Sequence, residues 1–282
     1  MKIIRSPKAM WTASQKIRKG GLTLGLVPTM GALHEGHLSL IRRASRENNR
    51  VAVSIFVNSI QFGPHEDFRR YPRDFRKDAR LCAREGADFI FFPRPRAMYP
   101  EGFKTYVTVK ELSEPLCGAF RPGHFQGVAT VIAKLFNIVA PNKAYFGWKD
   151  AQQALIIRRL AEDLNIPVKI TIMPTMREQD GLAMSSRNQY LNAEQRIRAA
   201  IVPEALQKAR EMVKRGARDT RAIIKKIRPL IEATATKIDY VSIVDTGNLQ
   251  RVRRIKNTAL LATAVWIGKT RLIDNTILEI NK

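Results

Sequence analysis

The sequence has few of the features that mark secreted, membrane-spanning or disulfide-rich proteins. Its two cysteines, Cys82 and Cys117, form neither a disulfide framework nor a recognisable metal-binding spacing. No stretch approaches the ~20 apolar residues of a membrane helix, and residues 1–20 lack the apolar core of a signal peptide. No internal repeat or low-complexity linker is visible. We therefore expect a cytoplasmic globular protein with reduced cysteines and no membrane partner.

Acidic residues are also scarce. The chain has 25 Asp and Glu against 49 Lys and Arg, and a formal net charge of +24. The excess is spread along the chain: residues 194–282 carry 19 basic and 9 acidic residues, which leaves 30 and 16 before them. A nucleic-acid module concentrates its basic residues on one face beside a recognisable motif, and neither feature is present. We expect solvated basic surface, some attraction for anionic substrates, and no specific nucleic-acid partner.

One stretch, LTLGLVPTMGALHEGHLSL at residues 22–40, organises the rest of the chain. Its first part, residues 22–27, predicts a buried strand, residues 28–31 an exit loop, and residues 38–44 the apolar face of a helix. Such a strand-loop-helix unit is typical of an α/β sheet. The free N–H groups and the dipole at the start of the helix favour an anion there.

Two histidines, His34 and His37, lie one helical turn apart at this position. Their imidazole donors suit phosphate oxygens, and Gly31 and Gly36 let a nucleotide approach the backbone. Each histidine could instead be an ordinary surface or core residue, or the pair could bind a metal. Neither cysteine lies nearby in the sequence, and no third ligand stands at a recognisable spacing.

Further strands and helices are predicted on both sides of a boundary between residues 174 and 192. Before it, hydrophobic patterns predict strands at 51–58, 87–93, 105–112, 144–147 and 168–173, and helices at 67–86, 128–139 and 154–164. After it they predict helices at 194–215 and 220–235, and strands at 238–244, 259–267 and 271–280 joined by short turns. The second set predicts a small α+β domain.

Polar residues follow several of these strands. Asn58 and Gln61 come after the second strand, where side chains face the ligand crevice of an open sheet, although they could simply cap a turn. Lys149 lies at the strand-to-helix junction after residues 144–147, and its flexible ammonium suits phosphates. His124 could contact substrate or make a local structural hydrogen bond.

Four strings in order carry a resemblance to a known family. They are PTMGALHEGHLSL from Pro28, VNSIQFGPHEDFRRYPR from Val57, RPGHFQGVATVIAKLFNIVAPNKAYFGWKDAQQ from Arg121 and MREQDGLAMSSRNQYL from Met176. HEGH resembles the HxGH signature of the nucleotidyltransferase superfamily, and the strings together resemble the pantothenate synthetase (pantoate–β-alanine ligase) family.

The resemblance implies a Rossmann-like, doubly wound parallel sheet over residues 1–176 that binds nucleotide and pantoate. A smaller C-terminal α+β lid domain is implied over residues 177–282, beginning with the MSSRN loop. The implied reaction is the ATP-dependent condensation of (R)-pantoate with β-alanine through a pantoyl-adenylate, which gives pantothenate, AMP and pyrophosphate. ATP as co-substrate, Mg²⁺ held mainly by phosphate and water, and a homodimer are also implied; the protein ligand of Mg²⁺ is left open.

The resemblance also implies roles for individual residues. His37, His34, Lys149 and Arg187 are expected to stabilise the phosphates during adenylation. The expected ATP site comprises Met30, Gly31, Ala32, Leu33, His34, Glu35, Gly36, His37, Gly147, Trp148, Lys149, Asp150, Met176, Met184, Ser185, Ser186 and Arg187. Gln61 and Gln153 are expected to bind pantoate, Gln61 also β-alanine, with help from Asn58.

Two positions depart from the family pattern. Ser59 replaces the usual proline after Val-Asn, which predicts a less rigid loop around Gln61. Trp148 replaces the usual glutamate before Lys149, where it could line the nucleotide site or pack against a neighbouring element.

Two rival functions are considered. One is a nucleotidyltransferase that keeps AMP on its product, and the other is a polyanion-binding protein on a degenerate enzyme scaffold. Gln61, Gln153 and the Ser-Ser-Arg loop disfavour both.

The dispersed charge predicts weak binding to nucleic acid that depends on salt and not on base sequence. Titration of labelled duplexes of different sequence should show similar affinities at low salt and loss of binding at physiological salt. A tight complex with one sequence that survives physiological salt would contradict this expectation.

Overall fold

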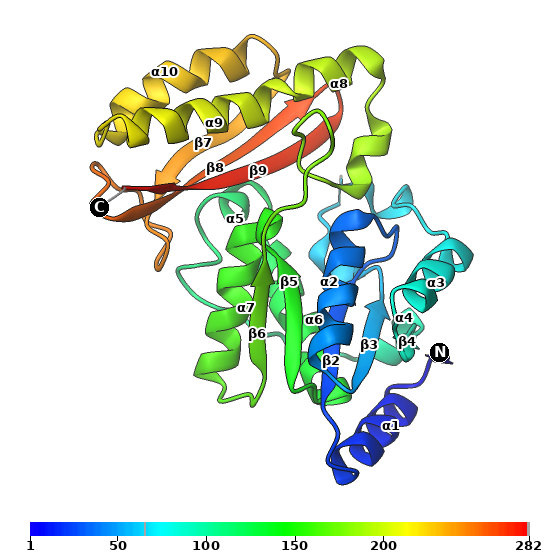
Figure 1. The fold of residues 1–282 in the computed structure, drawn as a ribbon. Helices are drawn as coiled ribbons and strands as arrows, with labels where there is room; N and C mark the ends of the chain where they lie inside the picture. The colour runs from blue at the N-terminus through cyan, green and yellow to red at the C-terminus, as the bar shows by residue number, and fades with distance from the viewer. Residues whose placement is uncertain (65, 281–282) are drawn as a thin grey trace. The chain divides into compact units, whose positions relative to one another are not determined.

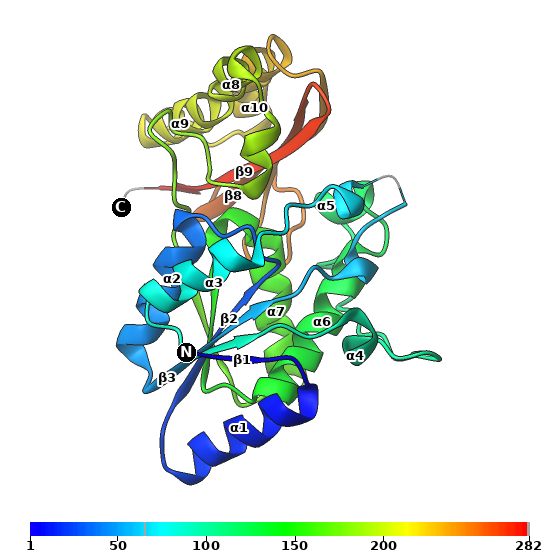
Figure 2. The ribbon, with the colours of Figure 1, turned by 90° about the vertical axis from the view of Figure 1, so that its right-hand side faces the viewer.

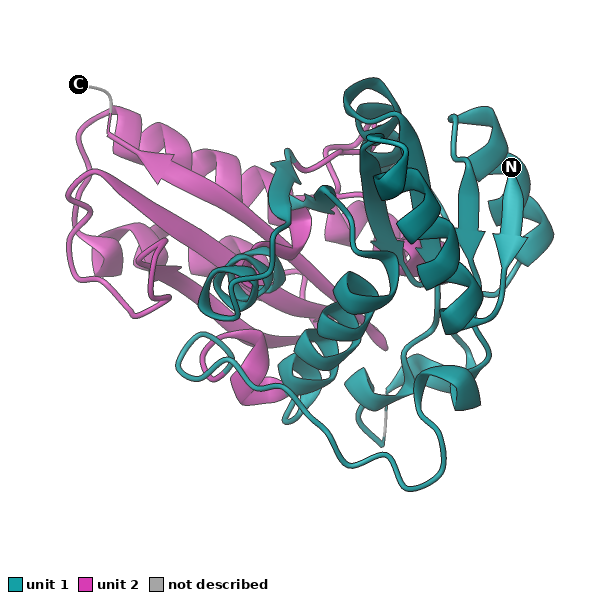
Figure 3. Cartoon of the chain, turned by 90° about the horizontal axis from the view of Figure 1, so that it is seen from below, with its two compact units in different colours: residues 1–113, 121–148, 153–174 teal, residues 114–120, 149–152, 175–282 magenta. Residues whose placement is uncertain are grey.

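A computed structural model describes residues 1–64 and 66–280, which fold into two compact units (Figure 3). Unit 1 comprises residues 1–113, 121–148 and 153–174. Unit 2 comprises residues 114–120, 149–152 and 175–282. Across the described ranges, no helix is both long and apolar enough to cross a membrane.

Unit 1 is built on a six-stranded sheet in the order β1-β4-β3-β2-β5-β6, and every neighbouring pair is parallel (Figure 1). The strands are β1 Lys2–Ile4, β2 Leu24–Thr29, β3 Arg50–Ile55, β4 Phe89–Phe91, β5 Lys143–Gly147 and β6 Lys169–Met173. Leu24, Leu26 and Val27 of the central strand are completely buried, since a parallel sheet is covered on both faces. The predicted doubly wound α/β sheet is confirmed.

Helices cover the two faces of this sheet (Figure 2). α2, Glu35–Glu47, and α3, Phe75–Arg84, lie on one face, where Ile41 and Ala44 pack with Val27, Val53 and Ile90. α1, Pro7–Lys19, α6, His124–Val139, and α7, Ala151–Asp163, lie on the other. The short helices α4, Pro95–Met98, and α5, Cys117–Phe120, lie in the connections.

The strand order reverses between β2 and β5. The chain leaves β2 into α2 on one face and leaves β5 into α7 on the other, so the loops after these two strands diverge at the carboxyl edge of the sheet, where open α/β sheets bind their ligands. Residues 30–37 follow β2, and Trp148 follows β5. Two of the stretches predicted to bind nucleotide, residues 30–37 and 147–150, therefore begin at the switch point of the sheet.

Unit 2 contains an antiparallel sheet in the order β7-β8-β9, with two long helices packed on it. Its elements are α8 Ala193–Ala199, α9 Ile201–Lys214, α10 Thr220–Glu232, β7 Lys237–Val244, β8 Thr258–Ile267 and β9 Thr270–Glu279. Leu206 and Ile227 of the helices share a core with Leu261 and Val265 of β8. The predicted α+β character is confirmed, although residues 245–257 make a longer connection than the expected short turn.

Several predicted elements differ in the structure. The helix predicted over 67–86 is interrupted: η2, Asp67–Arg69, precedes Pro72, and α3 begins only after Asp74 caps it through Lys77 N. The predicted strand over 105–112 is wrong, because these residues form no strand. Strand β2 runs through Pro28 and Thr29, which were predicted as loop. β1 and α1 had no sequence prediction.

The single helix predicted over 194–215 is two helices, α8 and α9. Asn192 and Gln195 cap the start of α8 reciprocally. The break falls at Ala200, because Pro203 has no N–H to donate to the carbonyl of Ala199 and its ring crowds that carbonyl.

The observed units also differ from the predicted division at residue 176. Residues 114–120 and 149–152 belong to unit 2, although they lie far from it in sequence. Gln152 joins them, since its amide accepts from Cys117 N at 3.1 Å and donates to Pro115 O at 2.8 Å. Asn275 of β9 donates to Lys149 O at 2.9 Å. These tertiary hydrogen bonds have no signature in sequence spacing.

Candidate functional site

The loop after β2 has a backbone conformation that one buried carboxylate holds in place. Gly31 has φ +83°, and a Cβ there would lie 2.9 Å from Asp78 Oδ2. Ala32 also has positive φ, +52°. Its N–H donates to Asp78 Oδ2 at 2.9 Å, and the N–H of Leu33 donates to Oδ1 at 2.8 Å. α3 thereby fixes the loop that leads into HEGH.

Asp78 was not anticipated as part of the site. It is 2% exposed, and burial raises the pKa of its carboxyl group while the backbone N–H groups of Leu33 and Ala32 act in the opposite direction. A sequence signal did exist: Asp78 lies four residues before Cys82, on the buried face of α3. A carboxylate on the apolar face of a short helix indicates a specific partner.

His34 and His37 are brought together at the start of α2. Their ring centroids are 4.1 Å apart, and the N–H of His34 donates to Nδ1 of His37 at 3.4 Å. Because Nδ1 of His37 accepts, the proton of its neutral ring lies on Nε2, which is then a hydrogen-bond donor. The first turn of α2 adds its own N–H groups and dipole. This end of the helix is suited to an anionic ligand.

The side chain of Gln61 is held by Asn58, a residue of its own loop that is itself bonded to α6. Asn58 donates from Nδ2 to Gln61 Oε1 at 2.9 Å and to Gly127 O at 3.0 Å, and Tyr99 donates to Asn58 Oδ1 at 2.6 Å. Both amide hydrogens of Asn58 are thus engaged within the protein. Gln61 Nε2 is 3.3 Å from Met30 Sδ, which places its donor group beside the loop after β2.

Unit 2 carries Lys149, one of the two cations predicted for the ATP site. Lys149 lies in η3, Trp148–Asp150, and its Nζ is 3.5 Å from Asp150 Oδ1. The side chain of Lys149 is 19% exposed, so the ammonium is partly desolvated. The hydrogen bond from Asn275 Nδ2 to the carbonyl oxygen of Lys149 fixes the main chain of Lys149. The result is a cation on an anchored main chain with a flexible side chain.

The predicted MSSRN loop is also anchored within unit 2. Met184 N donates to Met176 O at 3.0 Å, so two residues predicted for the ATP site are neighbours. Ser185 Oγ accepts from Arg187 N at 3.2 Å and caps η4, Ser186–Tyr190. Arg177 binds the buried carboxylate of Asp274 through two hydrogen bonds, at 2.7 and 3.0 Å. This ion pair ties the start of the loop to β9.

The remaining predicted residues occupy the first turns of helices and the end of a strand. Glu35 and Gly36 open α2, and Glu35 forms an ion pair with Arg42, two turns further along the helix. Gly147 ends β5, and Gln153 lies in the first turn of α7.

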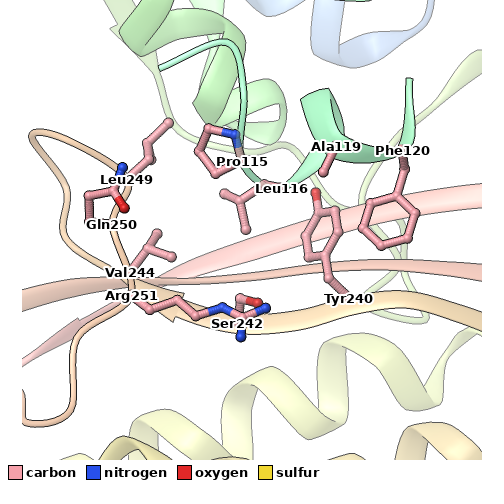
Figure 4. A pocket seen from close by; sticks show the side chains of 10 residues that line it. All are labelled: Pro115, Leu116, Ala119, Phe120, Tyr240, Ser242, Val244, Leu249, Gln250 and Arg251. Carbon is pink, nitrogen blue, oxygen red and sulfur yellow. The ribbon is translucent and has the colours of Figure 1, made fainter. Parts of the chain in front are cut away.

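A separate cavity of about 360 Å³ lies within unit 2 and contains none of the predicted site residues (Figure 4). Its lining residues are Pro115, Leu116, Ala119, Phe120, Tyr240, Ser242, Val244, Leu249, Gln250 and Arg251. Most of these side chains are apolar, and Arg251 supplies the charge. It lies between residues 115–120 and strand β7, outside the stretches that follow β2 and β5.

No group of three or more His, Cys, Asp or Glu side chains with metal-binding geometry occurs among residues 1–64 and 66–280. The donors described above are imidazoles, amides, hydroxyls, backbone N–H groups and cations. This set can bind and orient phosphates and carboxylates and can stabilise charge that develops on phosphate oxygens.

Comparisons with known proteins agree with this chemistry. A family model described as pantoate-beta-alanine ligase matches residues 2–277. A pantothenate synthetase from a Sulfurihydrogenibium species is 53% identical over 277 residues, which cover 98% of this chain and 99% of the relative.

Solved structures agree as well. The crystal structure of pantothenate synthetase from Thermus thermophilus matches with a TM-score of 0.92 and 42% identity over 98% of this chain and 99% of that one. The pantoate-beta-alanine ligase of Francisella tularensis, crystallised with beta-gamma ATP and beta-alanine, matches with a TM-score of 0.83 and 35% identity over 100% and 99% of the two chains.

The Asp78 contacts predict a large effect of one substitution on stability. Asp78→Ala leaves the N–H groups of Ala32 and Leu33 without their acceptor, and each unsatisfied buried donor costs about 1–3 kcal/mol. We expect the free energy of unfolding in urea to fall by about 2–4 kcal/mol. The control is Asp74→Ala on the same helix, which removes only a helix cap worth about 1 kcal/mol. Equal losses in the two variants would contradict a special role for Asp78.

Proposed function

Since this chain belongs to the pantoate-beta-alanine ligase family, we propose that it joins pantoate to β-alanine at the expense of ATP, with release of AMP and pyrophosphate. The observation that carries the proposal is the match over nearly the whole chain to pantothenate synthetases, with HEGH at the switch point of the sheet. The proposed product, pantothenate, is the precursor of coenzyme A.

The chemistry explains why no protein nucleophile is needed. A carboxylate oxygen of pantoate attacks the α-phosphorus of ATP, and the bond to the pyrophosphate oxygen breaks. The amine of β-alanine then attacks the carbonyl carbon of the mixed anhydride, loses a proton, and AMP leaves with the former anhydride oxygen. The protein must hold the attacking oxygen in line with the α-phosphorus and the leaving oxygen, place the amine beside the anhydride, and stabilise charge on the phosphates.

We assign the phosphates of ATP to His34, His37, Lys149 and Arg187. The Nε2–H of His37 and the N–H groups of the first turn of α2 would donate to phosphate oxygens. The ammonium of Lys149 can follow charge as it moves toward the leaving pyrophosphate. Arg187 and the hydroxyl groups of Ser185 and Ser186 would contact the β- and γ-phosphates.

The remainder of the ATP site is assigned to the loops around these groups. It would comprise residues 30–37, 147–150 and 184–187 together with Met176. Gly147 permits close approach of the nucleotide to the backbone, and Trp148 would line the site.

We assign pantoate to Gln61 and Gln153, and β-alanine to Gln61. Gln61 suits this role because its Oε1 is engaged by Asn58, which leaves its Nε2 as the donor directed along the loop after β2. Asn58, predicted as a substrate contact, would act by holding Gln61, since its own amide hydrogens are used within the protein.

Mg²⁺, a homodimer and a cytoplasmic location complete the proposal. Mg²⁺ would be held mainly by phosphate oxygens and water, and it would neutralise charge on the pyrophosphate. Asp150, which lies beside Lys149, supplies a carboxylate of the type that Mg²⁺ prefers. The dimer and the location follow from the family resemblance and stay predictions.

The proposed reaction predicts which substrates each half-reaction needs. Exchange of labelled pyrophosphate into ATP should require pantoate and not β-alanine, whereas net AMP formation should require both. Exchange that proceeds equally with unrelated carboxylic acids, or pantothenate formed with ADP as co-product, would overturn the assignment.

Removal of either proposed phosphate-binding group should slow the first half-reaction. His37→Ala and Lys149→Ala should each reduce single-turnover adenylate formation by about 10²- to 10³-fold, the usual cost of deleting one group that stabilises developing charge. Lys143→Ala, at the start of β5, removes a partly exposed ion pair with Glu47 and should change the rate by less than about twofold. Rates near wild type for His37→Ala and Lys149→Ala would contradict their transition-state roles.

A further inference from the structure

The start of α6 lies directly on the backbone of Gln61. Gly127 makes this possible, since a Cβ there would lie 2.5 Å from Ile60 O and 2.7 Å from Gln61 Cα. No other residue fits without moving one of the two main chains. The first turn of α6 is therefore in a position to set where Gln61 lies.

His124, the first residue of α6, makes a hydrogen bond to Gln61 itself. The residue is 8% exposed, and its Nδ1 lies 2.9 Å from Gln61 O. The sequence predicted this histidine in a loop before the helix, with substrate contact or a local hydrogen bond as alternatives. The structure places it within the helix and in contact with the main chain of a predicted substrate residue.

The partner on the other ring nitrogen determines the tautomer. Arg121 Nη1 lies 2.9 Å from His124 Nε2, and a guanidinium group only donates. Nε2 must therefore accept and carry no proton. The proton of the neutral ring lies on Nδ1, where it is donated to the carbonyl oxygen of Gln61.

Arg121 is itself fixed by a carboxylate. Its Nε and Nη2 donate to Glu66 Oε1 and Oε2 at 2.7 and 2.5 Å, in the paired geometry that orients a guanidinium group. A chain of hydrogen bonds thus runs from Glu66 through Arg121 and His124 to the main chain of Gln61. On the side-chain end, Asn58 holds Oε1 of the same residue.

We propose that His124 is a positioning residue for Gln61, and that Arg121 enforces the Nδ1–H tautomer that this role requires. The inference rests on the proposed function, in which Gln61 binds pantoate. His124 lowers the cost of binding the acid because Gln61 is already in place before the substrate arrives. Loss of this bond weakens pantoate binding and leaves ATP binding largely unchanged.

Two isosteric variants separate the two ring nitrogens. Asparagine at position 124 can place an amide N–H near the Nδ1 position and retains the donor to Gln61 O. Glutamine reaches the Nε2 position, where it retains the acceptor for Arg121 and loses the donor to Gln61. Gln126→Asn, an exposed change in the same turn of α6, is the matched control.

The readout is the pantoate concentration that gives half-maximal pyrophosphate exchange, measured beside the same quantity for ATP. We expect His124→Gln to raise the pantoate value about tenfold, close to the effect of one hydrogen bond, and to change the ATP value less than about twofold. His124→Asn should stay within about threefold of wild type for both. Equal effects of the two variants, or no effect of His124→Gln on pantoate, would overturn the proposal.

A second measurement does not depend on catalysis. The ¹⁵N chemical shifts of His124 in the folded wild-type protein should show a protonated Nδ1 and an unprotonated Nε2, and Arg121→Met should abolish this preference. A protonated Nε2 in the wild type would overturn the proposal even if exchange requires pantoate. Absence of exchange with the expected tautomer present would instead reject the proposed function.

Discussion

The site depends on one buried carboxylate, Asp78, and on the backbone that it holds. Positive φ at Ala32 costs about 1–2 kcal/mol, because its Cβ crowds the carbonyl oxygen. A buried N–H group left without an acceptor costs about 1–3 kcal/mol, and Asp78 satisfies two such groups. The contacts therefore outweigh the local strain. Without them the turn after β2 would relax, and the histidines at the start of α2 would lose their orientation.

Gln61 shows a related arrangement, in which both its side-chain oxygen and its main-chain oxygen accept a hydrogen bond. Asn58 engages the side-chain oxygen, and His124 engages the main-chain oxygen. Each of these residues has its own fixed partner, Tyr99 for Asn58 and Arg121 for His124. The departure at Ser59 predicted a looser loop, and the hydrogen bonds from Tyr99 and His124 restrain that loop from outside it. Gln61, the residue proposed to bind pantoate, is thus held by residues that need not contact substrate themselves.

In unit 2, the groups proposed to contact phosphates also lie on main chain that other residues hold in place. Lys149 keeps a flexible side chain on a main chain bonded to Asn275, and the MSSRN loop begins at Arg177, which is fixed to a buried aspartate. A flexible cation can follow moving charge only if its point of attachment stays in place. The anchoring contacts come from β9, at the far end of the chain, so the last strand contributes to the proposed ATP site without supplying a ligand.

The sequence by itself determined the fold class and the resemblance to the family, and it predicted the candidate residues of the site. Apolar runs such as residues 24–27 indicate buried strands, and HEGH at the start of the following helix favours an anionic ligand, because both signals are local. Local patterns also misled where proline intervened: the helix predicted over 194–215 breaks before Pro203. Tertiary structure alone decided what holds the candidate residues in place. Asp78 reaches Ala32 and Leu33 across more than 40 residues of chain, and Glu66 meets Arg121 across 55. Such pairs are made when separate elements pack against each other, so no periodicity or spacing in the sequence records them.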